Sequence, residues 1–441
     1  MLYGYRGFAP QMTIASERTI PLPAKEKLWN RDFFILWQGQ LVSALGDVIY
    51  SIALGFWILA KTGSTALMGA LMAASALPRV LASPFAGVLV DRSDRKRLLI
   101  LTDVVRGLAV VLVGVAALLG FIQVWMVFVT GIVIGLGGAF FNPSVSSSLP
   151  DIVNRNRLVQ ANSVFHMIHT LSGLAGNSAG GFLFKILGAP VMFLFNGLSY
   201  LFSALAVLFI RIPKIKPKKE HSHFFVDMKE GFSFIWHFRG LRDLLAFAAI
   251  GNFFAFMGII LILPLFERLP HLGPARYGMV MACLTGGLLA GLLFTSIVHI
   301  RPEKRFRMFA ASATLATFNM ILFPIFLYFP LMAFLAFLSG VASALFNTFI
   351  ASVIQLTVPQ DMRGKVFGLL GSLSSGLTPF AMVIGGVLAE FIPMRVLISG
   401  SFAVTILLYI PLFLSAEFRR TITFNPATQT PADLMSAQAI K

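Results

Sequence analysis

Three ionisable side chains stand inside long apolar stretches of this sequence, where a charge is costly and therefore informative. Asp47 lies in the apolar run 33–60, and Asp103 and Arg106 lie in the run 98–120. A carboxylate surrounded by hydrocarbon takes up or releases a proton when its exposure to water changes. These residues are therefore candidates for coupling proton movement to a change of conformation.

Their positions along the predicted helices suggest different roles. Asp103 and Arg106 are three residues apart, hence on one face of a helix, and only about 8–13 Å from its end at 1.5 Å per residue. A pairing of both with Arg79 of the preceding apolar run would be structural, and we favour that role for Asp103. Asp47 lies about 21 Å along its own helix. Proton coupling and a hydrogen-bonded structural role are both open for Asp47.

The composition identifies the class of protein. Of 441 residues, 57% are hydrophobic and 12% are charged, whereas a typical soluble domain carries about 25% charged residues. The mean hydropathy is +0.84, so we expect an integral membrane protein. The single cysteine, Cys283, excludes an internal disulfide, and we expect neither a metal nor a cofactor. Without a G-x-x-x-x-G-K-[ST] motif or a long soluble stretch, neither direct ATP coupling nor an enzyme is expected.

Apolar runs of about 20 residues, the length that crosses a bilayer, recur along the chain. They predict helices at 33–60, 66–90, 98–120, 123–149, 160–186, 188–211, 241–267, 275–299, 306–328, 330–357, 363–390 and 394–416. The expected fold is an all-α membrane protein with twelve transmembrane helices in two pseudo-symmetric six-helix bundles. Its expected parts are an N-terminal segment 1–32, bundles 33–211 and 241–416, a central loop 212–240 and a polar tail 417–441.

The basic residues predict the orientation. Of the 35 Lys and Arg residues, 28 fall in segments that face one side of the predicted topology and 5 face the other. By the positive-inside rule, both termini and the central loop lie in the cytoplasm, and the bilayer is the cytoplasmic (inner) membrane. The net charge of +17 is therefore a topology signal, and no nucleic-acid partner is expected.

An internal repeat relates the two halves. A shift of 205 residues pairs Gly180-Gly181 with Gly385-Gly386 and Asp47 with Asn252. Around the second and eighth helices the alignment moves by about four residues, so that Gly69 matches Gly278. Such repeated bundles rock about a site near the middle of the bilayer, and small residues allow their helices to cross closely.

The residues 87–97 read G-V-L-V-D-R-S-D-R-K-R between two apolar runs. Four basic side chains cannot lie in hydrocarbon, so we expect a tight turn at the membrane surface. Gly87 is expected to let two helix backbones approach closely just before this turn.

This turn resembles the signature loop between helices 2 and 3 of the major facilitator superfamily, G-x-L-x-D-R-x-G-R-[KR], with Ser93-Asp94 in place of x-Gly. The matching positions and the adjoining cation are Gly87, Leu89, Asp91, Arg92, Arg95, Lys96 and Arg97. In that family the loop helps to hold the cytoplasmic side closed in the outward-facing state. The resemblance implies this gating role here.

Other segments sharpen the resemblance. The stretches W-Q-G-Q-L-V-S-A-L-G-D at 37–47 and V-P-Q-D-M-R-G-K-V-F-G-L at 358–369 are similar to the efflux subfamily of macrolide-efflux proteins and the enterobactin exporter. The similarity covers about residues 30–415. It implies proton-driven export of a small amphiphilic, drug-like or siderophore-like molecule by alternating access. A monomer is expected.

Several uncharged or weakly basic side chains are candidates for lining a substrate cavity. They are Phe141, Asn142, His166, His169, Asn252 and Asn347. Packing or hydrogen bonding between helices is the alternative role for each of them, and the two histidines are weak evidence for a metal.

Two alternatives to proton-driven efflux remain. One is transport of a lysophospholipid or another lipid-like substrate with little proton dependence. The other is a membrane protein that keeps the fold for assembly or sensing without transport, against which the complete signature loop and Asp47 argue.

Overall fold

The computed structural model describes residues 28–212, 232–298 and 300–424. Among these residues there is no strand, and the chain is almost entirely helical. The helices in chain order are α1 (Arg31–Thr62), α2 (Thr65–Arg92), α3 (Arg95–Leu118), α4 (Val124–Ile152), α5 (Leu158–Leu208), α7 (Arg239–Ile259), α8 (Ile262–Arg268), α9 (Gly273–Ile297), α10 (Pro302–Leu322), α11 (Phe329–Thr357), α12 (Gln360–Phe391), α13 (Met394–Leu414) and α14 (Ala416–Ile422). A 3-10 turn, η1 (Arg155–Arg157), precedes α5.

These helices follow the predicted order of membrane spans. Ten of the described stretches are long and apolar enough to cross a membrane, with α7 and α8 together forming one of them. The 51-residue α5 contains two spans, because Gly188 at φ 71° and the following Pro190 interrupt the helix. With α5 counted twice and the 21-residue α10 included, the order matches the twelve predicted ranges.

Short polar caps explain why the first helices begin where they do. The side chains of Asn30, Ser64 and Asp94 accept hydrogen bonds from backbone N–H groups three residues later, at the starts of α1, α2 and α3. A helix N-terminus leaves such donors without partners, so a cap stabilises the first turn by about 1 kcal/mol. Gly63 at φ 68° ends α1 in the left-handed conformation and permits the tight turn into α2. Asp94 thus has a structural role within the basic turn.

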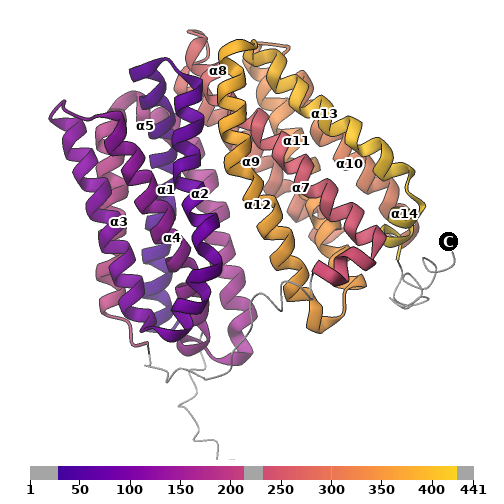
Figure 1. Cartoon of the computed structure of the whole chain (residues 1–441), viewed down its shortest axis with the longest axis horizontal. Helices are drawn as coiled ribbons and strands as arrows, with labels where there is room; N and C mark the ends of the chain where they lie inside the picture. Colours follow the sequence, from indigo (N-terminus) through magenta and orange to yellow (C-terminus); the bar gives the residue numbers. More distant parts are fainter. Residues whose placement is uncertain (1–27, 213–231, 299, 425–441) are drawn as a thin grey trace, which may run out of the picture.

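Figure 1 shows two groups of helices, α1–α5 and α7–α14, that converge at one end of the molecule. Each group has its own apolar core, with Phe56 and Phe193 fully buried in the first and Phe266 and Phe323 in the second. Large apolar side chains such as Leu112 remain on the outer surface, as expected where lipid rather than water surrounds the helices.

The contact between the two groups, here called the seam, is formed mainly by two equivalent helix crossings. In one crossing, an added Cβ at Gly386 of α12 would lie 2.5 Å from the carbonyl oxygen of Thr65 in α2. In the other, an added Cβ at Gly278 of α9 would lie 2.7 Å from the carbonyl oxygen of Asn177 in α5. Glycine alone leaves room for backbones this close.

The same crossings follow the sequence repeat. Gly69 meets Met382, and Gly181 meets Pro274, in the same reciprocal arrangement. The glycines that the sequence repeat aligns therefore make equivalent contacts in the two crossings.

The seam is confined to one end of the molecule. Near the other ends of α2 and α12, an added Cβ at Gly87 or Gly371 would meet no atom within 4 Å. Figure 1 shows the two groups diverging toward the end where the α2–α3 turn lies. The expectation that Gly87 allows a close helix approach is wrong for this conformation, because the halves are separated there.

Two segments expected to be irregular contain helix. Residues 232–237, in the predicted central loop, are helical. The predicted polar tail begins with α14, whose Phe418 and Ile422 are buried against the second group of helices. Their apolar side chains pack into the core, which outweighs the polar character of the surrounding sequence. The rest of the tail, the central residues 213–231 and the first 27 residues lie outside the described residues.

Candidate functional site

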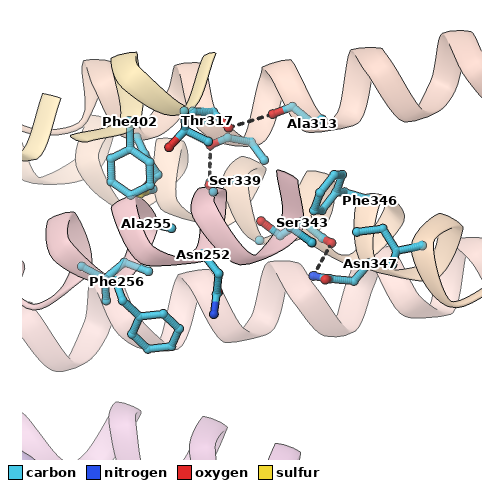
Figure 2. Close-up of a pocket in the computed structure, with 18 of the residues that line it drawn as sticks. Asn252, Ala255, Phe256, Ala313, Thr317, Ser339, Ser343, Phe346, Asn347 and Phe402 are labelled. Carbon is cyan, nitrogen blue, oxygen red and sulfur yellow. Dashed lines mark hydrogen bonds between the residues drawn. The ribbon is translucent and has the colours of Figure 1, made fainter. Parts of the chain in front are cut away.

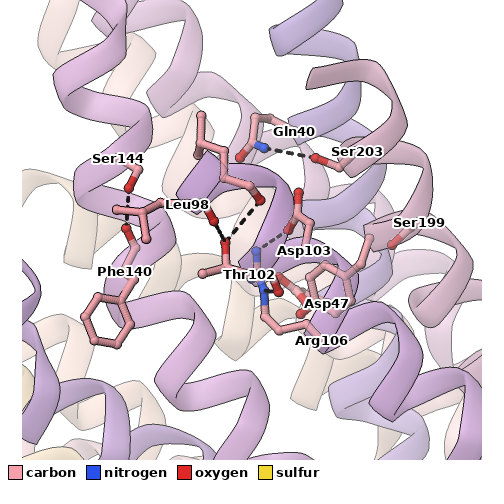
Figure 3. A network of polar contacts seen from close by, with 12 residues as sticks. Gln40, Asp47, Leu98, Thr102, Asp103, Arg106, Phe140, Ser144, Ser199 and Ser203 are labelled. Carbon is pink, nitrogen blue, oxygen red and sulfur yellow. Dashed lines mark hydrogen bonds and ion pairs between the residues drawn. The ribbon is translucent and has the colours of Figure 1, made fainter. Parts of the chain in front are cut away.

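The buried charges of the first group of helices form one network (Figure 3). Arg106 forms an ion pair with Asp103, one turn earlier on α3, and its Nε donates to the Thr102 carbonyl oxygen at 3.3 Å. Asp103 is 0% and Arg106 5% exposed. The predicted shared face of Asp103 and Arg106 is thus present as a direct pair. In a buried pair each charge neutralises the other, which lowers the cost of keeping both away from water.

Two aromatic rings enclose the guanidinium of Arg106. Its Cζ atom lies 4.5 Å from the ring centroid of Phe141 on α4 and 4.4 Å from that of Tyr200 on α5. The aliphatic part of Arg106 lies on Gly137, where an added Cβ would be 2.7 Å from the arginine side chain. Stacking on both faces and a glycine below the stem hold the cation in one position.

The Asp47 carboxylate joins this network through Tyr200. The phenol hydroxyl of Tyr200 donates a hydrogen bond to Asp47 Oδ1. Gly46 brings α1 close enough, because an added Cβ there would lie 2.5 Å from Ser199 Oγ. Asp47 itself is half-buried, unlike the fully enclosed Asp103. Tyr200 was not predicted from the sequence, although a phenol within an apolar run was a usable signal.

Neighbouring polar groups extend the network. Gln40 Nε2 donates to Ser203 Oγ at 3.4 Å, which links α1 to α5 one turn away from Tyr200. Among the described side chains, Asp103 Oδ2 and Asn196 Nδ2 are buried atoms without a hydrogen-bond partner. Buried polar atoms usually have partners, so Asp103 Oδ2 is available to accept a further hydrogen bond and Asn196 Nδ2 to donate one.

The second group of helices contains a cavity instead of charges (Figure 2). It has a volume of about 520 Å³ and is lined by residues from all six long helices of that group. Its polar groups include the amides of Asn252 and Asn347 and the hydroxyl of Thr317, and no lining residue carries a charge. Aromatic rings such as Phe256 and Phe346 provide much of the remaining surface. This combination suits an uncharged or apolar part of a small molecule.

The network and the cavity occupy related positions of the repeat. Asn252 corresponds to Asp47, and Phe346 corresponds to Phe141. Gly251, the counterpart of Gly46, is less tightly packed, with the nearest atoms 3.7 Å from an added Cβ. The first half has filled this space with Arg106 and Tyr200, and the second half has left it open.

The basic turn after α2 makes its described contacts within the first half. Arg95 Nη1 donates to Asp151 Oδ2 at 2.8 Å and to the Ser147 carbonyl oxygen at 2.9 Å. Lys96 donates to the carbonyl oxygens of Leu208 and Ile210, both at 2.8 Å. The turn therefore ties α3 to the ends of α4 and α5.

The remaining charged residues of this turn make fewer described contacts. Arg97 lies 3.6 Å from Asp94 and is largely exposed. The side chains of Asp91 and Arg92 lie outside the described residues.

Comparison with known proteins now identifies the family. The family model described as "Major Facilitator Superfamily" matches residues 36–377. The chain belongs to the major facilitator superfamily. Members of this superfamily are membrane transporters rather than enzymes, so the chain is a multi-pass transport protein.

Relatives of this facilitator include drug-efflux proteins. Macrolide efflux protein A of Streptococcus pyogenes is 25% identical over 404 residues, covering 87% of this chain and 96% of the relative. Multidrug efflux pump Tap of Mycolicibacterium fortuitum is 27% identical over 364 residues, covering 79% and 87%. These relatives support a drug-type efflux transporter and confirm the resemblance read from the sequence.

Solved structures confirm the fold of the facilitator. A D-xylose-proton symporter aligns with a TM-score of 0.67 at 12% identity, covering 90% of this chain and 98% of that one. A bacterial homologue of the human lysosomal transporter Spinster aligns with a TM-score of 0.63 at 16% identity, covering 93% and 96%.

The other predicted site residues of the facilitator are spread over its two halves. Asn252 Nδ2 donates to the Ser374 carbonyl oxygen at 3.0 Å, and Asn347 Nδ2 donates to that of Ser343 at 2.9 Å, both at the cavity. Asn142 and His169 are exposed, and Phe141 is buried against Arg106. The side chain of His166 lies outside the described residues.

Metal binding receives no support within the described part of the chain, where no group of three His, Cys, Asp or Glu side chains is close enough to hold an ion.

Arg79 was expected to pair with Asp103 and Arg106, but it lies apart from them on α2 and is exposed. The reason is that Asp103 is already neutralised on its own helix by Arg106.

Proposed function

We propose that this facilitator exports small amphiphilic molecules, drug-like or siderophore-like, by proton antiport with alternating access. The observation that carries the proposal is the hydrogen bond from Tyr200 to Asp47 beside the Arg106–Asp103 pair. Asp47 is the half-buried carboxylate of this network, placed near the middle of a 32-residue helix. Such a carboxylate can take up a proton on one side of the membrane and release it on the other when the transporter alternates between its two open states.

The charge of the network explains how a proton can be coupled to movement. With Arg106 and Asp103 both ionised, an ionised Asp47 gives the network a net charge of −1. A proton on Asp47 makes the network neutral, which lowers the cost of enclosing it between the two halves. In this proposal Asp103 and Arg106 stay ionised as a fixed ion pair, while Asp47 takes up and releases the proton.

The substrate cavity that we propose is the one in the second half, with Asn252 and Asn347 as hydrogen-bonding groups. Because six helices surround it, a compact amphiphile suits the cavity better than a lysophospholipid with a long chain. Phe141, Asn142, His166 and His169 remain candidates on the first half. Separate regions for proton and substrate allow each to influence the other through the rocking of the halves.

We further propose that the facilitator acts as a monomer in the cytoplasmic membrane with both termini inside the cell. The basic turn then marks the cytoplasmic end, and the described conformation is open toward the cytoplasm. The domain boundaries follow the predicted bundles 33–211 and 241–416. In the outward-facing state, the turn formed by Gly87, Asp91, Arg92, Arg95, Lys96 and Arg97 holds the cytoplasmic end closed.

The test is efflux of a fluorescent amphiphile, measured in everted membrane vesicles with and without a proton gradient. Asp47→Asn keeps the shape of the side chain but removes its ability to ionise. We expect binding to remain and gradient-driven transport to be lost. Asp243→Asn is the matched control, because Asp243 pairs with Arg242 outside the network.

Equal gradient-driven transport by the wild type and Asp47→Asn would remove Asp47 from the mechanism. Transport that is insensitive to the gradient in the wild type would overturn proton antiport and favour release of a lipid-like substrate.

A further inference from the structure

Arg79 is a cation in the middle of α2, far from either end of the helix. It lies 14 positions after Thr65 and 13 before Arg92, so at 1.5 Å per residue it is about 20 Å from both ends. The window Thr65–Gly87 is apolar enough to span a membrane. A charged side chain at this depth is costly and marks a functional site more often than a structural one.

The side chain of Arg79 faces the interior of the transporter. Its guanidinium lies against α4, where an added Cβ at Gly138 would be 3.2 Å from Nε. The next residue, Val80, lies near Gly376 of α12 in the other half. Leu81, about 200° around the helix from Arg79, is 62% exposed. The contacts of Arg79 with α4 and of Val80 with α12 therefore direct Arg79 between α4 and the second half.

The positive charge of Arg79 has no partner in the described part of the structure. Among the described acidic residues, only Asp47 and Asp103 lie more than two turns from a helix end, and each has another partner. Arg106, the other cation at depth, is neutralised by Asp103. Arg79 is thus the cation at this depth that has no acidic partner among the described residues.

A second donor lies on the same face of α4. Asn142 follows Gly138 by four residues, about 6 Å along the helix. It is exposed, and among the described residues its amide makes no hydrogen bond. A guanidinium and an amide on adjoining helices together offer several N–H donors to the oxygens of a small oxyanion.

We propose that Arg79 and Asn142 recognise an oxyanion, such as a carboxylate, sulfonate or phosphate, on the transported amphiphile. This inference rests on the proposed export function and narrows its substrate class to anionic or zwitterionic molecules. Gly138 is part of the site, because its missing side chain lets the guanidinium lie on the α4 backbone. The apolar part of the substrate remains free to contact the aromatic residues of either half.

The experiment compares two probes that differ only in the anion. These are 8-anilinonaphthalene-1-sulfonate and the neutral N-phenyl-1-naphthylamine, titrated against the full chain in phosphatidylcholine nanodiscs with empty nanodiscs subtracted. For Arg79→Gln we expect the affinity for the sulfonate to fall by about tenfold or more. The affinity for the neutral probe should change by less than about twofold. Arg420→Gln, an identical change at an exposed position of α14, should alter neither affinity.

Further variants separate recognition from structure. Arg79→Lys keeps the charge but loses the planar donors, so we expect an intermediate affinity for the sulfonate. Asn142→Ala should weaken sulfonate binding less than Arg79→Gln does. An equal loss for both probes in Arg79→Gln, or unchanged sulfonate binding, would overturn the oxyanion site.

The outcome for the neutral probe distinguishes this inference from the function itself. If the wild type binds and exports the neutral probe but Arg79→Gln leaves sulfonate binding unchanged, only the anion site is wrong. If the wild type binds neither probe, both proposals fail. Competition by phosphatidylglycerol in the wild type, absent in Arg79→Gln, would support the site and assign its anion to a lipid headgroup.

Discussion

Tyr200 and Asp47 are 153 residues apart in the chain, yet the tyrosine hydroxyl donates a hydrogen bond to the aspartate carboxylate. The face of the same ring covers the guanidinium of Arg106, whose Cζ lies 4.4 Å from the ring centroid. One side chain therefore contacts both the proposed proton carrier and the buried cation. We therefore expect a change in the charge of Asp47 to reach α3 through this ring.

Tyr200→Phe removes the hydrogen bond to Asp47 but keeps the ring over Arg106. A hydrogen bond to a charged group contributes about 1.5–3 kcal/mol, so we expect gradient-driven efflux to fall severalfold and the unfolding temperature to fall slightly. Tyr200→Leu also removes the cation–π contact and should lower the unfolding temperature further. Efflux in vesicles and thermal unfolding of the purified protein test this. Identical behaviour of the two variants in both measurements would contradict the separate roles of hydroxyl and ring.

Asp103→Asn leaves the charge of Arg106 buried without its partner. Breaking a buried pair in this way costs about 3–5 kcal/mol, so the apparent unfolding temperature should fall clearly. Arg106→Gln should have a similar effect because it isolates Asp103 instead. The double variant Asp103→Asn with Arg106→Gln should be more stable than the sum of the two single effects predicts. Simple additivity would show that the two charges do not stabilise each other.

Gly386→Ala places a methyl group 2.5 Å from the Thr65 carbonyl oxygen, at the centre of the α2–α12 crossing. The backbones must separate to accept it, so we expect the conformation with a closed seam to lose population. Gly371→Ala, on the same helix but with no atom within 4 Å of the added Cβ, is the control.

The effect of Gly386→Ala can be measured as a distance between spin labels. Lys61→Cys and Tyr328→Cys place one exposed label on each half, in a background where Cys283→Ser removes the native thiol. Electron–electron resonance should show longer label separations in Gly386→Ala. An unchanged distribution would show that the crossing tolerates a side chain.

Glu390 ties the end of α12 to the start of α2. Its Oε1 accepts hydrogen bonds from Ser64 Oγ at 2.9 Å, Thr65 Oγ1 at 3.0 Å and the Ala66 backbone N–H at 3.0 Å. A carboxylate at a helix N-terminus also interacts favourably with the helix dipole.

Glu390→Gln removes this charge while keeping the shape of the side chain. Because the site is exposed to solvent, the effect on the same label distances should be smaller than that of Gly386→Ala. Glu303→Gln, in the first turn of α10, removes a similar charge away from the seam and should leave the distances unchanged. A larger effect from Glu303→Gln would contradict the role of Glu390 as a tie between the halves.

The sequence alone determined the class of protein, the order of its helices and the equivalence of its two halves. Long apolar runs need the bilayer, and the repeat that pairs Gly180-Gly181 with Gly385-Gly386 specifies equivalent contacts in both halves. The pair of Asp103 and Arg106 was also predictable, because residues three apart share a helical face.

Only the tertiary structure decided which residues meet across helices. The sequence did not indicate that Tyr200 is the partner of Asp47, that Arg79 stands apart from the network, or that the second half contains the cavity of Figure 2. These helices are apolar on nearly all sides, so the pattern of the sequence leaves their rotation about the helix axis open. Close packing settles it instead: Gly46 lets α1 press against α5, while its counterpart Gly251 lies beside open space.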